Sequence, residues 1–183
     1  MSILESIMVK YWHFLWHPMH LGCSYVAARL LNHAFDNMYR DEHRLIPRRK
    51  FYFLLFPIER IQIKRAIVLV LLVIVAAVGE NWSARHDFLN GGNGYGSLGS
   101  HLAERALVHL GFLGSMFAWV GILVTKTQNT AIATVFSYVI AIQIVLIGFV
   151  VGEVTMLDNV AVILLVQFLS VCYAANLLRK KIL

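Results

Sequence analysis

A junction between a basic segment and a long apolar run limits what this chain can fold into more than any other feature. The segment 40–65 contains eight Lys and Arg residues, and the run AIVLVLLVIVAAVG at 66–79 follows it directly. Cations that flank an apolar helix stay on the cytoplasmic side, because moving them across a bilayer is costly. The junction therefore predicts a membrane helix that starts at the cytoplasmic face.

The composition supports this prediction for the whole chain. Hydrophobic residues make up 59% of the 183 residues and charged residues only 14%, against about 25% charged residues in a typical soluble domain. The net charge of +6 does not indicate a nucleic-acid protein, because the cations gather at the ends of apolar runs without a base-reading motif. We therefore expect an integral membrane protein that does not bind nucleic acid directly.

Four apolar runs are candidates for membrane spans. They cover about 63–79, 106–124, 130–151 and 160–178, and a glycine-rich segment at 80–105 separates the first two. A span needs about 20 mainly apolar residues in a helix. The sequence predicts an all-α integral membrane protein, with a four-helix transmembrane domain at 63–178, an outer loop at 80–105 and a basic cytoplasmic tail at 179–183.

The distribution of cations orients these helices. With both termini in the cytoplasm, only Arg85 and Arg105 of the 16 Lys and Arg residues lie on the outer side, which agrees with the bias of cations toward cytoplasmic segments. The residues expected to anchor this topology are Arg48, Arg49, Lys50, Lys64, Arg65, Arg179, Lys180 and Lys181.

The N-terminal region 1–62 is predicted to lie at the cytoplasmic face. Apolar residues recur at helical spacing before and after Pro18, which predicts two amphipathic, interfacial helices separated by that proline. The short apolar segment 51–58 is expected to dip into the interface. The residues that we expect to dock a cytoplasmic protein are Trp12, Trp16, Leu30, Leu31 and Phe35.

Small residues repeat along two of the predicted spans. Small side chains on one helix face let two backbones approach closely, so that dispersion contacts accumulate. We expect these faces to pack helices together, within one chain or between chains of a homo-oligomer. The residues concerned are Gly111, Gly114, Ser115, Ala118 and Gly121 in the second span, and Ser137, Ala141, Gly148 and Gly152 in the third.

Three histidines of the N-terminal region, His13, His17 and His20, follow helical spacing. Imidazoles on one helix face can ligate a metal or a haem iron, although Pro18 disturbs the alignment. The chain's two cysteines lie far apart and indicate neither a metal motif nor a redox pair. A metal- or haem-binding subunit is therefore an alternative, while the main prediction includes no metal and no cofactor.

Few polar side chains fall inside the predicted spans. Transporters and proton pumps usually place an ionisable side chain near the middle of the membrane, and the predicted spans place none there. A small oligomeric transporter or channel built around Gln143 and Gln167 remains a second alternative. No nucleophile–base pair, carboxylate pair or metal motif indicates an enzyme.

These observations lead to one main functional prediction. We expect a non-enzymatic subunit of a larger multi-protein membrane complex, of the secretion, conjugation or respiratory type. Its partners would be the lipid bilayer, other membrane subunits and a cytoplasmic protein docked by the N-terminal region. The bacterial inner membrane is the expected location. The endoplasmic reticulum is the alternative, because Lys180 and Lys181 resemble a dilysine retrieval signal.

Overall fold

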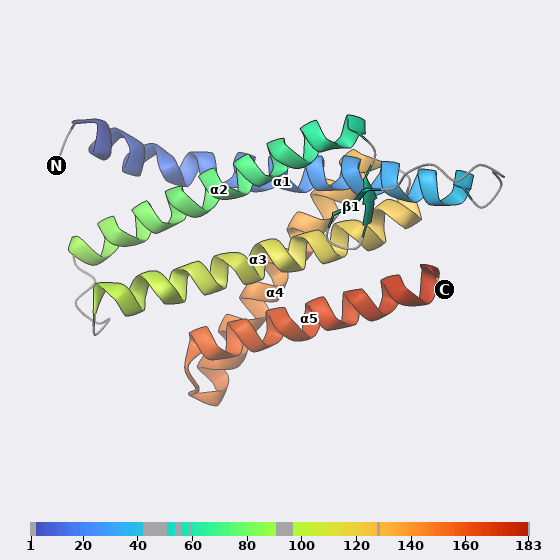
Figure 1. The fold of residues 1–183 in the computed structure, drawn as a ribbon. Coiled ribbons are helices and arrows are strands. Elements are labelled where there is room, and N and C mark those ends of the chain that lie inside the picture. The colour runs from blue at the N-terminus through green and yellow to red at the C-terminus, as the bar shows by residue number, and fades with distance from the viewer. Residues whose placement is uncertain are drawn as a thin grey trace.

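The computed structural model describes residues 3–41, 51–53, 56–58, 60–90, 97–127 and 129–182, and the side chains of 15–35, 63–90, 97–127 and 129–180. Within these ranges the chain forms five helices and one short hairpin (Figure 1). The elements are α1 (Ile3–Asp41), β1 (Phe51–Phe53), β2 (Phe56–Ile58), α2 (Arg60–Leu89), α3 (Leu98–Thr127), α4 (Thr130–Thr155) and α5 (Asn159–Ile182). The strands are antiparallel, with Phe51 paired to Ile58, so the segment expected to dip into the interface forms a hairpin.

Helix α3 lies at the centre of the bundle and contacts each of the other four helices. Successive helices alternate in direction, so α1, α3 and α5 run one way while α2 and α4 run the other (Figure 1). The start of α1 and the end of α5 consequently lie at opposite ends of the bundle. The side of a membrane on which each terminus lies stays a prediction.

Three of the described helices, α3, α4 and α5, are long and apolar enough to cross a membrane. They contain the predicted spans 106–124, 130–151 and 160–178, so the helical membrane-protein character is confirmed. The predicted fourth span, 63–79, lies within α2 and is not among these three.

The segment 80–105 is more helical than the sequence indicated. Helix α2 continues to Leu89 and α3 already begins at Leu98, while 91–96 lie outside the described residues. The side chain of Ser97 accepts a hydrogen bond from the backbone N–H of Ser100 at 3.2 Å, which is the geometry of a helix N-cap. Most of the polar segment predicted as a loop is therefore helical. It forms the last turns of α2 and the first turns of α3.

Helix α1 is one continuous helix, and the predicted break at Pro18 does not occur. A proline inside a helix removes a backbone hydrogen bond, but here the helix packs against α2, α3 and α4. Cys23, Ala27 and Ala28 are buried in these contacts, because small side chains let helices approach closely. Helix α1 thus continues through the proline, and tertiary packing holds it against the other helices.

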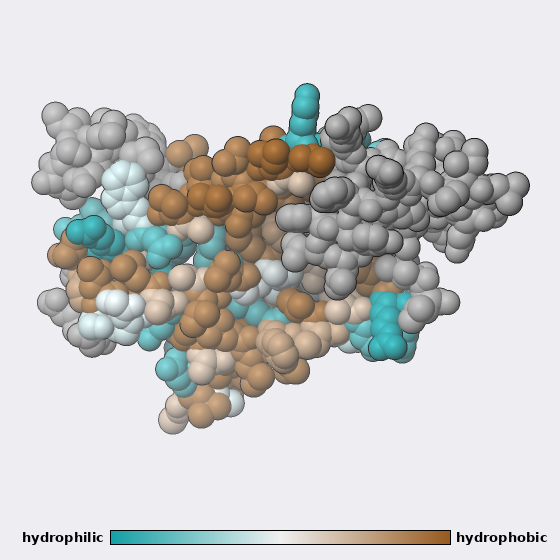
Figure 2. Space-filling view, in the orientation of Figure 1, coloured by the Kyte–Doolittle hydropathy of each residue, from teal (hydrophilic) through white to brown (hydrophobic). Residues whose placement is uncertain are grey.

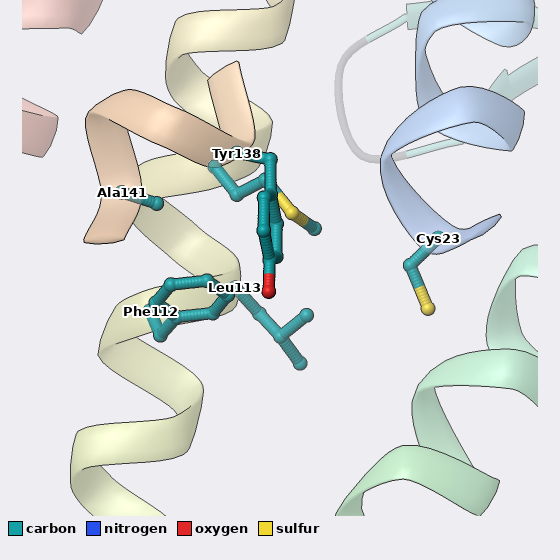
Figure 3. Packing of buried hydrophobic residues seen from close by; sticks show 6 residues of the cluster. Cys23, Phe112, Leu113, Tyr138 and Ala141 are labelled. Atoms are coloured by element: carbon teal, nitrogen blue, oxygen red, sulfur yellow. The ribbon is translucent and has the colours of Figure 1, made fainter. Parts of the chain in front are cut away.

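The bundle core forms where α1, α3 and α4 meet. Phe112 and Leu113 of α3 face Tyr138 and Ala141 of α4, with Cys23 of α1 on the opposite side (Figure 3). The rings of Phe112 and Tyr138 meet edge to face at a centroid distance of 5.8 Å, an arrangement that aromatic pairs favour. In the coloured part of Figure 2, apolar side chains cover much of the surface around the middle of the bundle.

Candidate functional site

A cavity of about 280 Å³ lies between α1, α2, α3 and α4. Its wall combines apolar side chains with a group of aromatic and charged residues. The lining residues are Trp16 and His17 of α1, Glu80 of α2, Arg105, Val108, His109 and Phe112 of α3, and Ile142, Val145 and Leu146 of α4. Concave sites with an apolar wall and a few polar groups are typical of ligand binding, so we call this the histidine–tryptophan cavity.

A hydrogen-bonded network joins three helices at the polar end of the cavity. The indole Nε1–H of Trp16 donates to Oε2 of Glu80 at 2.9 Å. The other oxygen of Glu80 accepts from Nη1 of Arg105 at 3.5 Å, and Nη2 of Arg105 donates to Asp87 at 3.0 Å. The network holds Trp16 at the wall of the cavity. The indole N–H already has an acceptor in Glu80.

Two histidines of α1 take different partners. His17 forms a hydrogen bond through Nδ1 with the hydroxyl of Tyr138. His20 donates from Nδ1 to the backbone carbonyl of Trp16 at 2.7 Å, one helical turn earlier. This bond fixes the tautomer of a neutral His20 ring, so Nε2 carries the lone pair.

His109 of α3 is the polar lining group with unmet hydrogen-bonding capacity. Its side chain is 4% exposed, and neither ring nitrogen has a hydrogen-bond partner among the described residues. The ring of His20, which is fully buried, meets it edge to face at 4.9 Å. A buried donor without a partner costs about 1–3 kcal/mol, so this position favours a bound molecule that accepts the hydrogen bond.

Further polar contacts tie α1 and α5 to the same bundle. Ser24 and Ser137 share a buried hydrogen bond at 2.8 Å, and Ser137 donates its own hydroxyl to the Thr134 carbonyl. Ser24 is therefore the donor in the pair. On the other side of α3, Nε2 of Gln167 donates to the carbonyl of Val108 at 3.2 Å.

The structure describes only part of the predicted histidine ligand set. The side chain of His13 lies outside the described residues, while His17 and His20 are bonded to Tyr138 and to the Trp16 carbonyl. Across the described part of the chain, no group of three His, Cys, Asp or Glu residues is placed to hold a metal ion.

The predicted small-residue faces lie at helix contacts within the chain. A Cβ built on Gly111 would come within 2.0 Å of Oε1 of Gln167. One built on Gly148 would lie 2.7 Å from the Cα of Ile163. Both contacts join α5 to its neighbours, so glycine here permits close approach inside one protomer.

The residues expected to dock a partner have contacts inside the bundle. Leu31 and Phe35 pack with Val120 and Val124 of α3, and Trp16 lines the cavity. Leu30 is half-buried, and the side chain of Trp12 lies outside the described residues. These α1 residues bind the chain's own helices because α1 runs along the spans.

The predicted anchors that the structure describes lie at one end of the bundle. Lys64 and Arg65 are near the start of α2, and Arg179 and Lys180 near the end of α5, and both helix ends lie toward the right in Figure 1. Arg48, Arg49, Lys50 and the side chain of Lys181 lie outside the described residues.

Sequence reasoning missed the cavity because its polar groups come from helices that are distant along the chain. His17 pairs with a residue 121 positions away, and Trp16 with one 64 positions away. One available signal was the series of small residues Cys23, Ser24, Ala27 and Ala28, which marks a face of α1 suited to close helix packing.

Comparison with known proteins gives no relative on which to base a function. No protein-family model matches the chain, and no significant match is found among the curated proteins or the solved structures.

Proposed function

We propose that this chain is a small, non-enzymatic integral-membrane subunit of a larger multi-protein membrane complex. The supporting observation is the turn between α4 and α5. Val154, Met156 and Leu157 are 77%, 94% and 62% exposed there, although they lie at a helix end beside the charged residues Glu153 and Asp158. Apolar side chains gathered at a polar helix end are typical of a protein contact surface.

The backbone of this turn adds support. Met156 has φ 55°, and it is the non-glycine residue with positive φ within the described ranges. Its N–H bonds to the carbonyl of Gly152, which closes α4 with a left-handed cap. Glycine or asparagine usually fills that position, so the methionine supplies a large apolar side chain where the backbone favours a smaller residue.

The proposal includes a placement in the membrane. Helix α2 would be the fourth crossing helix, because Ile67, Leu71, Ile74 and Val78 are all more than half exposed along one of its faces. The end that carries Lys64 and the C-terminal cations would face the cytoplasm. The start of α1 would then lie on the outer side, in the bacterial inner membrane or, alternatively, the endoplasmic reticulum.

The test is site-specific photocrosslinking in the native membrane. Met156 is replaced by p-benzoylphenylalanine, and the matched control carries the same residue at Leu165, a 57% exposed position on the side of α5. We expect a protein adduct of one defined mass at 156 and lipid adducts at 165. The adduct protein should also co-purify stoichiometrically in mild detergent. Lipid adducts alone at both positions would refute the proposal.

The two alternative functions gain less support from the contacts. A channel around Gln143 and Gln167 requires both amides to face a common pore, yet Gln167 is 1% exposed and packs against α3, whereas Gln143 is exposed. A metal or haem subunit requires several ligating side chains close together, and no group of three His, Cys, Asp or Glu residues in the described part of the chain is placed to hold a metal ion.

A further inference from the structure

We propose that the histidine–tryptophan cavity binds the head group of a neutral, lipid-soluble molecule of the quinone class, a flat ring that carries carbonyl oxygens. Only binding is proposed, without electron transfer. The inference goes beyond the proposed subunit function and rests on different residues, so either can fail alone. Four properties of the cavity carry it: the shape of the wall, the balance of charge, the free donor and the route of entry.

The wall favours a flat ring. Trp16, Phe112 and two imidazoles line the cavity together with aliphatic side chains from α3 and α4. The rings of Trp16 and Phe112 lie 5.3 Å apart at a tilt of 42°. Aromatic faces and edges interact favourably with another planar ring, and a volume of about 280 Å³ is at the small end of ligand pockets.

The balance of charge favours a neutral head group. Glu80 and Arg105 are the charged lining residues, and their charges cancel across a contact of 3.5 Å. Arg105 also contacts Asp87, so two carboxylates share one guanidinium. A phosphate or carboxylate ligand would meet Glu80 without a free cation to compensate it, and an uncompensated charge in an apolar site is costly.

The free donor fits a carbonyl oxygen. A neutral His109 ring has one N–H to donate, and its ring nitrogens have no partner among the described residues. Trp16 already donates to Glu80, whereas His109 is a buried lining residue that can donate to a ligand without breaking a bond. His17, whose Nδ1 is bonded to Tyr138, is a second polar side chain in the same wall.

The route of entry lies on the apolar surface. Leu146 lines the cavity and is also 56% exposed, so the cavity reaches the outside of α4. Ile142 and Val145 continue this wall inward. A molecule with an apolar tail could thus leave its tail among lipids while its ring lies beside His109.

The test measures equilibrium binding of a benzoquinone with a decyl tail to the full chain in detergent. We expect saturable binding near one molecule per chain. His109→Leu should weaken it about tenfold, the factor that corresponds to one hydrogen bond of ordinary strength, and His109→Gln, which keeps an N–H donor, should restore much of it. All variants must elute as the wild type does in size exclusion.

A cavity-filling pair locates the site. Val145→Phe places bulk in the cavity, and Val150→Phe makes the same change at a 57% exposed position of the same helix. Binding should be lost in the first variant and kept in the second. No saturable quinone binding, equal binding by both variants, or tighter binding of oleate than of the quinone would each overturn the proposal.

Discussion

Replacing Gly148 by alanine should separate α4 from α5 and destabilise the bundle. A Cβ at this position would lie 2.7 Å from the Cα of Ile163 and 3.3 Å from its backbone nitrogen. Backbone atoms cannot rotate away as a flexible side chain can. The helices must therefore move apart locally by roughly 1 Å to reach ordinary van der Waals contact, and a gap of that size forfeits a large part of each dispersion contact.

The expected cost is about 1–3 kcal/mol, the usual range for overpacking a close contact. Gly114→Ala is the matched control, because its Cβ would meet only Cγ2 of Val171 at 4.0 Å. That change also removes a helix-weakening glycine, worth up to about 1 kcal/mol. The control should therefore be neutral or slightly stabilising, and the two alanine variants should differ clearly in stability.

The chain contains its own reporter for this measurement. Cys23 is a buried free thiol, whereas Cys172 is exposed, so a Cys172→Ser background leaves one thiol that reacts with a maleimide dye only when the bundle opens. Thermal ramps in detergent should show Gly148→Ala reacting at a lower temperature than the background, and Gly114→Ala at the same or a higher one. Equal transitions for both variants would refute the close approach of α4 and α5.

Three further predictions concern α1. Ser24→Ala and Ser137→Ala should each lower stability, and a double-mutant cycle should return a coupling of about 0.6 kcal/mol, as for other hydrogen bonds between membrane helices; additive effects would contradict their 2.8 Å contact. Trp16→Phe, which removes the donor to Glu80, should cost about 1 kcal/mol, while Glu80→Gln, which keeps an acceptor, should cost less in the same thiol assay. Epitope tags at the two termini should be accessible to antibodies from opposite sides of the membrane. The N-terminal tag should be labelled from outside, and the C-terminal tag only after permeabilisation. Access to both from one side would show that α1 does not run along the spans.

The sequence predicted the parts of the fold that depend on local composition. The runs at 106–124, 130–151 and 160–178 lie in helices able to span a membrane, because their apolar length alone requires burial in lipid or protein. The close contacts of Gly148 and Gly111 also follow from spacing on one helix face. In each case the signal lies within one helix.

The sequence did not predict what depends on distant partners. Helix α1 is long, and its mixed polarity is as typical of an interfacial helix as of one packed against other helices. Its position is defined by contacts with distant residues, such as His20 with His109 and Ser24 with Ser137. The cavity has the same origin, because its lining comes from four helices and no short segment contains the pattern.

The pairing of α1 with α4 has a consequence for how the protein is made. Ser24 and His17 find partners 113 and 121 residues later in the chain, and synthesis at about 5–20 residues per second delays those partners by roughly 6–24 s. During that interval the polar face of α1 must remain at the membrane surface or inside the insertion machinery. Helix α1 is thus synthesised first, but its polar side chains gain these partners only once α4 has been made.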